Sequence, residues 1–576
     1  MTETAGKPNN DAEKKTSAKG KPFSLASLST LKSNLLDLAC ASLFLNVLGL
    51  ALPMSLLQVY DRILPNSSIG TLVFLMAAVA GALTLESILN VCRSHLTGWI
   101  GAKFEHKASC AALERLLDSR IDAFERDGAG AHVERVASIS SVREFYAGQA
   151  MLTLLDLPFA VLYLGLVALM GGQLVIVPLA LLVAFAVAAM FVGTKTREAL
   201  AKRSEADDRR FNFVIEVLSG IHSVKAFSLE TQMTRRYERL QEACAQGAYQ
   251  VSLRGANAMG ISSFFSQATT ICVALAGAVF VLDGDMTTGG LAACSMLAGR
   301  AMNPLQKALG VWTRFQSFIL AKERLKALFE IETESVPGLP AIKDVKGGIA
   351  LRDVSFRYGE KLPFILENVS MEARPGECVV ISAGNGAGKT TLLALLQGAI
   401  KPETGELLVN GEPASRFDPQ SLRSKIAYLP QAGELFQGTI LQNLTMFRKK
   451  FDDVAQDVAG ALGLDEIVAT MALGYDTPVG DGAHDSLPRG IRQRIAIARA
   501  LVDDPDVILF DEANTAVDTA GDAYIRTWLE RAKGRKTLVL VTSRPSLAKL
   551  ADRSYVLEGG TLREKPKKND EGERAP

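Results

Sequence analysis

Long apolar stretches dominate the first half of the chain. Six of them occur before residue 315, at about residues 35–58, 69–92, 151–170, 174–193, 260–282 and 288–312. A helix needs about 20 apolar residues to cross the hydrocarbon core of a bilayer, and the first five stretches meet this length plainly. The sixth is weaker because Arg300 interrupts it. Together they predict an all-α bundle with six membrane-spanning helices.

The polar connections between these stretches differ in charge. The connections at 93–150 and 194–255 are long and rich in Lys and Arg, whereas the turns at 171–173 and 282–288 carry no basic residue. Since cytoplasmic loops of membrane proteins are enriched in Lys and Arg, both long connections and both chain termini are predicted to be cytosolic. The long connections also contain many Glu, Ala and Leu and almost no proline, which predicts that they are helical.

Carboxylates fall in or near some of the predicted spans. They belong to Asp37, Glu86 and Asp156. An ionisable residue in a span is a candidate functional group, but these residues lie near the predicted cytosolic ends. We therefore interpret them as solvated helix ends.

The second half of the chain changes to short β-rich runs that alternate with helices. The segment CVVISAGNGAGKTTLLALLQG is typical of a strand, a glycine loop and a helix. DVILFDEA is typical of a strand that ends in two carboxylates, and TLVLVTS of a third strand. Such alternation predicts an α/β domain with a mainly parallel sheet covered by helices.

The chain is thus predicted to be multidomain. Its parts are a disordered cytosolic arm (1–30), a membrane domain (31–331), a linker with Pro and Gly (332–347), an α/β domain (348–562) and a charged tail (563–576). The arm is polar and has no apolar core, unlike a secretory signal. The formal net charge of +1 gives no support to nucleic-acid binding. The cysteines form no CxxC pair, so the sequence indicates neither a zinc knuckle nor a disulfide framework.

The glycine loop AGNGAGKTT is typical of a nucleotide-binding site. Small residues let the backbone wrap a phosphate, while backbone N–H groups and the start of the next helix supply positive potential. The candidate nucleotide-binding residues are Ala383, Gly384, Asn385, Gly386, Ala387, Gly388, Lys389, Thr390 and Thr391. Lys389 is predicted to reach the β- and γ-phosphates of ATP, and the Thr390 hydroxyl to ligate Mg²⁺. The usual pattern begins with glycine where this chain has Ala383.

The run VILFDEA strengthens this prediction. Asp511 is expected to hold Mg²⁺ through water, and Glu512 to be the base that activates the attacking water. Residues that bind phosphate gather at the carboxyl ends of parallel strands. A glycine loop followed by an apolar run with two carboxylates therefore indicates an ATP site.

With these motifs, nearly the whole chain resembles an ATP-binding cassette (ABC) exporter half-transporter. LPRGIRQRIAIARAL aligns with the family signature, and DEANTAVD with its acidic strand and D-loop. The resemblance implies that Tyr358 stacks on adenine and that Gly490 of the signature contacts nucleotide. It also implies that Gln431 senses Mg²⁺ and works with Lys389 and Glu512 in catalysis.

A narrower resemblance lies in the membrane half. LQVYDRILPN and GGLAACSMLAGRAMNPLQ resemble the subfamily that energises type I protein secretion in Gram-negative bacteria. This resemblance implies an inner-membrane location, a polypeptide cargo, a periplasmic adaptor and an outer-membrane channel. Family members sandwich nucleotides between two facing domains, so the chain is expected to form a homodimer or a heterodimer with a second half-transporter.

The chain departs from the family pattern at the signature and at the switch position. Pro488 has neither a hydroxyl nor a backbone N–H, and Arg489 adds bulk where the backbone approaches phosphate. Ser543 stands where the family has a histidine, and serine cannot become cationic near neutral pH. Each lost phosphate hydrogen bond costs about 1.5–3 kcal/mol. We therefore expect these changes to reduce ATP hydrolysis by a homodimer of this chain.

Three hypotheses remain for the function. The first is a pump that couples ATP binding and hydrolysis to polypeptide export. The second is an ATP-binding subunit of a heterodimeric transporter that hydrolyses weakly or not at all. The third keeps the pump but changes its cargo to a lipid, a glycan or a small molecule.

Overall fold

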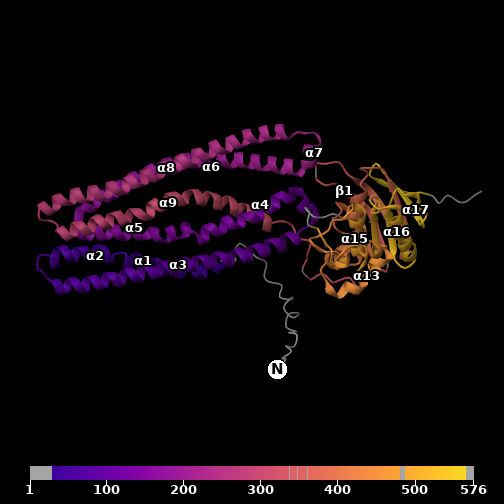
Figure 1. Ribbon diagram of the computed structural model, residues 1–576, viewed down its shortest axis with the longest axis horizontal. Coiled ribbons are helices and arrows are strands. Elements are labelled where there is room, and N and C mark those ends of the chain that lie inside the picture. Colours follow the sequence, from indigo (N-terminus) through magenta and orange to yellow (C-terminus); the bar gives the residue numbers. More distant parts are fainter. Residues whose placement is uncertain (1–28, 337, 347, 360, 481–486, 566–576) are drawn as a thin grey trace, which may run out of the picture. The chain divides into compact units, whose positions relative to one another are not determined.

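The computed structural model describes residues 29–336, 338–346, 348–359, 361–480 and 487–565 (Figure 1). Residues 1–28 of the predicted arm and residues 566–576 of the predicted tail lie outside this description. The chain divides into two compact units. One comprises the chain up to Leu116 together with Gly130–Glu330, and the other comprises Leu117–Ala129 together with the chain from Ile331 onward.

Long helices build the first unit. The helical segments are α1 (Ser29–Leu48), α2 (Ala51–Gln58), a π-helical turn (Val59–Ile63), α3 (Ile69–Leu117), α4 (Ile121–Ala147), α5 (Gln149–Gly171), a 3₁₀ turn (Gly172–Val175), α6 (Ile176–Ser219), α7 (Ile221–Ala226), α8 (Glu230–Leu282) and α9 (Thr288–Phe329). The first part of α4 belongs to the second unit, and the helix is broken at Gly128, whose φ of 76° is not helical. Helices α3, α6 and α8 have 49, 44 and 53 residues. They exceed the roughly 20 residues of a span, so the prediction of helical connections is confirmed.

Among the described residues, length and apolar composition mark four helical runs as able to cross a membrane: Leu36–Ile63, Ile69–Leu117, Gly130–Ser219 and Glu230–Leu282. The third of these contains both α5 and α6, so the four runs contain five of the predicted spans. The sixth predicted stretch forms α9, which does not qualify by composition because Arg300 and Asn303 interrupt it. Helix α9 nevertheless packs against α5 and α8.

Aromatic and aliphatic side chains pack these helices together. Phe145 of α4 stacks on Phe318 of α9 with ring centroids 4.2 Å apart. Tyr163, Val167 and Leu297 are buried in a second cluster formed mainly by α5, α8 and α9. Such contacts hold membrane helices together where water provides no hydrophobic driving force.

The two membrane-half motifs that carried the narrower resemblance meet in space. The carboxylate of Asp61, in the π-helical turn, accepts hydrogen bonds from the Thr287 hydroxyl at 2.7 Å and from the Gly289 backbone N–H at 2.9 Å. Asp61 therefore caps the N-terminus of α9 from a segment 228 residues away in the sequence. A Cβ at position 289 would lie 2.6 Å from Asp61 Oδ1, which explains the glycine there.

Replacing Asp61 by alanine should destabilise the membrane unit by about 1–2 kcal/mol, because the start of α9 loses its capping carboxylate. Thermal unfolding of the purified protein in nanodiscs would measure this loss. Asp285→Ala is the matched control, because Asp285 is exposed in the turn before α9. An equal melting temperature for the two variants would contradict the capping role.

The interpretation of Asp156 as a solvated helix end is wrong. Its side chain is 14% exposed and lies 3.5 Å from Nη1 of Arg93. The Asn46 amide also donates a hydrogen bond to Asp156 at 3.2 Å. Buried charges need such partners, and here they come from α1 and α3, which are remote in the sequence. Asp37, by contrast, is exposed.

The second unit is an α/β domain. Its strands are β1 (Ile349–Phe356), β2 (Leu366–Ala373), β3 (Cys378–Ala383), β4 (Thr404–Val409), β5 (Glu412–Pro413), β6 (Ile426–Leu429), β7 (Gly438–Thr439), β8 (Pro478–Val479), β9 (Val507–Asp511), β10 (Thr537–Val541), β11 (Arg553–Glu558) and β12 (Thr561–Lys565). Its α-helices are α10 (Lys389–Leu396), α11 (Pro419–Arg423), α12 (Ile440–Thr445), α13 (Asp452–Ala461), α14 (Leu464–Val468), α15 (Arg489–Leu501), α16 (Thr519–Ala532) and α17 (Pro545–Ala548). Strand β12 runs past residue 562, where the domain was predicted to end.

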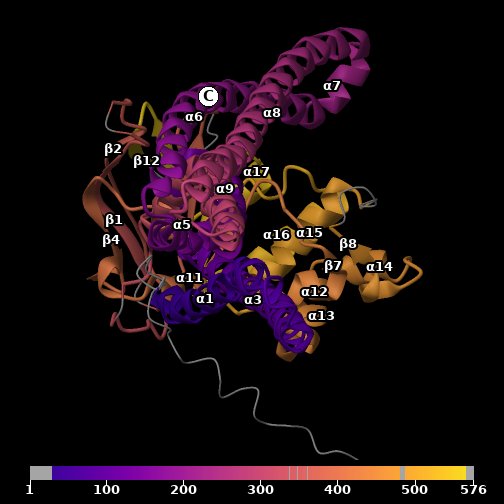
Figure 2. The same cartoon turned by 90° about the vertical axis from the view of Figure 1, so that its left-hand side faces the viewer.

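The main sheet has the order β12-β11-β3-β10-β9-β6 and is parallel except for its edge strand β12. An antiparallel sheet of order β2-β1-β4-β5 lies to one side of the unit, and helices α12 to α16 lie to the other (Figure 2). Every residue of β9 and β10 is buried, as expected for central strands covered on both faces. Helix α10 packs on one face of the sheet, and helices α15 and α16 pack on the other.

Candidate nucleotide site

The glycine loop connects β3 to α10. Gly386 and Gly388 have φ values of 75° and 92°, in the left-handed region that glycine adopts without strain. At Gly388 a Cβ would also lie 2.9 Å from a methyl group of Ile365. The loop thus leads directly into the N-terminus of α10, where backbone N–H groups without helical partners favour an anion.

Ala383 and Tyr358 flank this loop. Ala383 is the last residue of β3 and pairs with Leu557 of β11. Its backbone is not left-handed, so alanine in place of the usual glycine causes no backbone strain. Tyr358 is 47% exposed, and its hydroxyl lies 3.3 Å from Oγ1 of Thr391 in α10. A partly exposed ring beside the loop is available for stacking.

The structure brings the loop together with the two carboxylates at the carboxyl end of β9, those of Asp511 and Glu512. Lys389 Nζ donates to Glu512 Oε1 at 2.6 Å, and Thr390 Oγ1 donates to Asp511 Oδ2 at 2.9 Å. Strand β10 explains this proximity, because its residue Val541 pairs with both Ile381 of β3 and Asp511 of β9. The carboxyl ends of these strands therefore meet at one edge of the sheet.

Tyr428 is a site residue that the sequence analysis missed. It lies on β6, beside β9, and its hydroxyl donates to Asp511 Oδ2 at 2.9 Å. Burial, together with the neighbouring carboxylate of Asp511, raises the pKa of Tyr428, so the hydroxyl keeps its proton and remains a donor. Asp511 is only 4% exposed. The hydrogen bonds from Tyr428 and Thr390 stabilise its buried charge. The contact of this tyrosine, in the segment IAYLPQ, can be predicted only when β6 is known to lie beside β9.

The backbone of Glu512 is held in an unusual conformation. Its φ is 45°, in the left-handed region that residues other than glycine seldom adopt. The N–H of Glu512 donates to the Val541 carbonyl at 2.9 Å, and its own carbonyl accepts from the Thr515 N–H at 3.0 Å. Such conformations persist where surrounding structure enforces them, and they cluster at functional sites. The strand end thus fixes the direction in which this carboxylate leaves the sheet.

Gln431 lies in the segment after β6 and is exposed. Among the residues that the structure describes, its side chain makes no hydrogen bond. The segment itself is anchored on α15, since Gln493 Nε2 donates to the Pro430 carbonyl at 2.7 Å. A Cβ at Gly433 would lie 2.5 Å from Ala496 of the same helix. The structure therefore does not bring Gln431 into contact with Asp511 or Glu512.

The altered signature forms the start of α15. Pro488 occupies the N-cap position without a side-chain cap, and both Pro488 and Arg489 are exposed. A Cβ at Gly490 would lie 3.0 Å from the Ala516 carbonyl, so this glycine allows α15 to approach the D-loop closely. Ser543 follows β10 and is exposed; within the described part of the chain its hydroxyl makes no hydrogen bond.

A polar network next to Ser543 holds the D-loop. Arg544 donates to the Asn514 carbonyl at 2.9 Å and pairs with Asp522 at 3.0 Å. The Asn514 amide donates to the same Asp522 carboxylate. No local pattern predicts this network, because its members come from three separate elements.

Comparisons with known proteins decide the family. The family model described as "ABC transporter transmembrane region" matches residues 37–305, and the one described as "ABC transporter" matches residues 366–515. The chain belongs to the ABC transporters. The two matches cover both units, and they confirm the resemblance that the motifs indicated.

This ABC transporter has curated relatives over most of its length. It is 28% identical over 537 residues to "Leukotoxin translocation ATP-binding protein LktB" of Mannheimia haemolytica, with 93% of this chain and 76% of the relative covered. The protein of the same name from Mannheimia glucosida gives the same identity and coverage. Among solved structures, a bacterial Atm1-family ABC exporter with ATP bound is similar with a TM-score of 0.78 and 22% identity, covering 94% of this chain and 95% of that one. The structural similarity supports the fold alone.

The predicted fold class is confirmed: a helical transmembrane domain is followed by an α/β nucleotide-binding domain. The prediction of an ATP-driven exporter is also confirmed. ATP is bound by the second unit, whose glycine loop and strand-end carboxylates are described above. The transporter is a multi-pass membrane protein.

Proposed function

We propose that this ABC exporter moves a polypeptide across the inner membrane as the ATPase subunit of a type I secretion system. The relatives named for leukotoxin translocation support a polypeptide cargo. ATP-driven transport is supported by two hydrogen bonds at one edge of the sheet, from Lys389 to Glu512 and from Thr390 to Asp511. Both termini are proposed to be cytosolic, because the long connections are rich in Lys and Arg.

Each residue of the site then has a role. Residues Ala383 to Thr391 wrap the phosphates with backbone N–H groups, and Tyr358 stacks on the adenine. Lys389 exchanges its present partner Glu512 for the β- and γ-phosphates. Glu512, released from that pair, accepts a proton from the attacking water. Gly490 of the partner subunit's signature completes the site in the dimer.

The oxygen atoms at this edge fit Mg²⁺. The Thr390 hydroxyl and the Asp511 carboxylate are 2.9 Å apart, and Mg²⁺ prefers a few such oxygen ligands together with substrate phosphates. Gln431 would join them after the segment that carries it moves toward the nucleotide. When bound, Mg²⁺ neutralises charge that develops on the β- and γ-phosphate oxygens.

A weakly hydrolysing subunit is the second candidate function. The observation that favours it is the exposed start of α15, where Pro488 supplies no hydroxyl cap, together with the short side chain of Ser543. Partners would then include a different half-transporter with an intact signature. In either case the proposal includes a periplasmic adaptor and an outer-membrane channel.

Deleting this gene from its own organism should remove one or more polypeptides from the culture medium. Mass spectrometry of the secreted proteins would identify them. Wild-type chain should restore their export, and Lys389→Ala should not, because it lacks the phosphate-binding cation. An unchanged set of secreted proteins, with a changed lipid, glycan or small-molecule fraction, would refute polypeptide export and favour the other cargo.

A further inference from the structure

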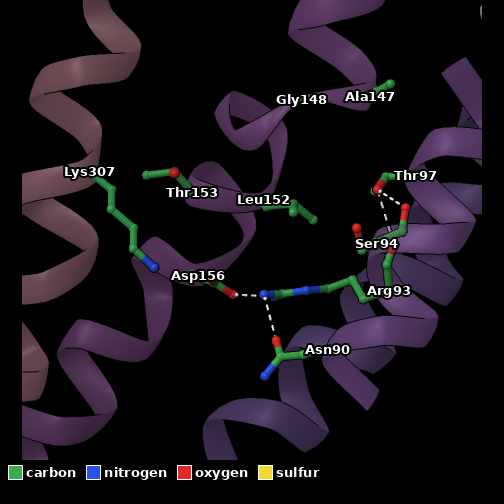
Figure 3. A pocket seen from close by; sticks show the side chains of 10 residues that line it. All are labelled: Asn90, Arg93, Ser94, Thr97, Ala147, Gly148, Leu152, Thr153, Asp156 and Lys307. Carbon is green, nitrogen blue, oxygen red and sulfur yellow. Dashed lines mark hydrogen bonds and ion pairs between the residues drawn. The ribbon is translucent and has the colours of Figure 1, made fainter. Parts of the chain in front are cut away.

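The membrane unit contains a polar cavity of about 290 Å³ (Figure 3). It is lined by Asn90, Arg93, Ser94, Thr97, Ala147, Gly148, Leu152, Thr153, Asp156 and Lys307. These residues come from α3, from the end of α4 and the start of α5, and from α9. The volume lies at the lower limit of pockets that bind small molecules, about 300–1,000 Å³, so the cavity suits a side chain rather than a large ligand.

The cavity wall already contains one carboxylate, that of Asp156, which has polar partners in the structure. Asp156 lies between Lys307 on one side and Arg93 on the other (Figure 3). Arg93 Nη1 is 3.5 Å from Asp156 Oδ1, and Asn46 donates to the same oxygen at 3.2 Å. Arg93 also donates to Asn90 at 3.3 Å. These side chains therefore stabilise a carboxylate at this place.

The cationic groups exceed the anionic ones. Arg93 and Lys307 are balanced only by Asp156 among the lining residues. Lys307 is exposed, and it makes no ion pair within the part of the chain that the structure describes. Its ammonium group points toward the cavity (Figure 3). One positive charge is thus left for a ligand.

The start of α5 adds to this positive potential. Gly148 is the N-cap of α5, a helix of 23 residues, and it lines the cavity together with Leu152 and Thr153. The first N–H groups of a helix lack helical partners and favour negative charge. Neither this helix end nor Lys307 would define a site alone; the cavity brings them together.

We propose that this cavity binds a carboxylate side chain of the exported polypeptide, with Lys307 and Arg93 as its cationic partners. The proposal rests on the proposed function of polypeptide export. A carboxylate matches the single excess charge and the geometry in which Asp156 is already held. Acidic residues of the cargo would then be recognised at the membrane unit, independently of the nucleotide site.

Peptide binding to the full-length protein in phosphatidylcholine nanodiscs tests this proposal. The probes are a fluorescent peptide rich in Glu and the same peptide with every Glu changed to Gln. Lys307→Met should weaken binding of the Glu peptide about tenfold, as expected for one charge-assisted hydrogen bond, and leave the Gln peptide unaffected. Lys307→Glu should weaken the Glu peptide further, whereas Lys307→Arg should retain its binding.

Lys322→Met is the matched control. Lys322 is an exposed lysine on the same helix, outside the cavity, and its removal should leave the affinity for both peptides unchanged. Equal affinity of the wild-type protein for the two peptides, or an equal effect of Lys307→Met and Lys322→Met, would overturn the proposal. The proposal would also be overturned if the protein bound phosphatidylglycerol vesicles in a Lys307-dependent way but did not bind the Glu peptide, since the site would then take a lipid headgroup.

The outcomes separate this inference from the proposed function. If gene deletion removes polypeptides from the medium but the Glu and Gln peptides bind alike, only the carboxylate site is wrong. If deletion leaves the secreted polypeptides unchanged, polypeptide export itself is wrong, whatever the cavity binds.

Discussion

Replacing Glu512 by glutamine should lower the rate of ATP hydrolysis by at least about 100-fold, the usual contribution of a general base. Glutamine has nearly the same shape but cannot accept a proton from water. Nucleotide binding should persist or tighten. In the wild-type structure the Glu512 carboxylate pairs with the Lys389 ammonium at 2.6 Å and so competes with the phosphates for this cation. Both quantities are measurable on purified protein, by phosphate release and by binding of a fluorescent ATP analogue.

The control for Glu512→Gln is Glu530→Gln, the same chemical change at an exposed residue of α16. It should leave both hydrolysis and binding unchanged. Hydrolysis that survives in Glu512→Gln would show that another group activates the water. Loss of nucleotide binding in the same variant would show that the Lys389–Glu512 pair supports the loop rather than competing with the nucleotide.

The parts of the site that lie close in the sequence were predictable, and the parts that depend on strand order were not. The loop from Ala383 to Thr391 was predictable from its own residues, since Gly386 and Gly388 adopt left-handed conformations that glycine reaches without strain. Tyr428 was missed because its contact with Asp511 requires β6 to lie beside β9. No local pattern shows that neighbour relation.

The membrane half illustrates the same limit. The motif around Asp61 was recognised, but its partner Gly289 lies 228 residues away. Only the folded bundle shows that Asp61 caps α9, the helix that contains Gly289. Asp156 was interpreted wrongly for the same reason, because Arg93 and Asn46 approach it from other helices. Apolar periodicity predicts which segments enter the membrane, whereas it does not predict which polar groups pair inside it.

Restoring the family residues at the altered positions should raise ATP hydrolysis by at least roughly 10–100-fold, the value of one recovered hydrogen bond. The triple change is Pro488→Ser, Arg489→Gly and Ser543→His. Each recovered hydrogen bond to the γ-phosphate is worth about 1.5–3 kcal/mol, which is about one to two powers of ten in rate if it acts mainly in the transition state. Steady-state hydrolysis by the purified protein would measure the gain.

Alanine at the same three positions is the matched control, because it removes the proline and the arginine without adding a side-chain donor to phosphate; it restores only the backbone N–H at position 488. If alanine raised the rate as much as the restored residues, slow turnover would result from obstruction by Pro488 and Arg489 or from the missing backbone N–H at position 488, and not from missing side-chain donors. Fast hydrolysis by the unmodified chain alone, abolished by Glu512→Gln, would contradict the weakly hydrolysing subunit. Helix α15 begins at Arg489, and Gly490 lies close to the D-loop, so the restored side chains would stand at the start of an ordered helix.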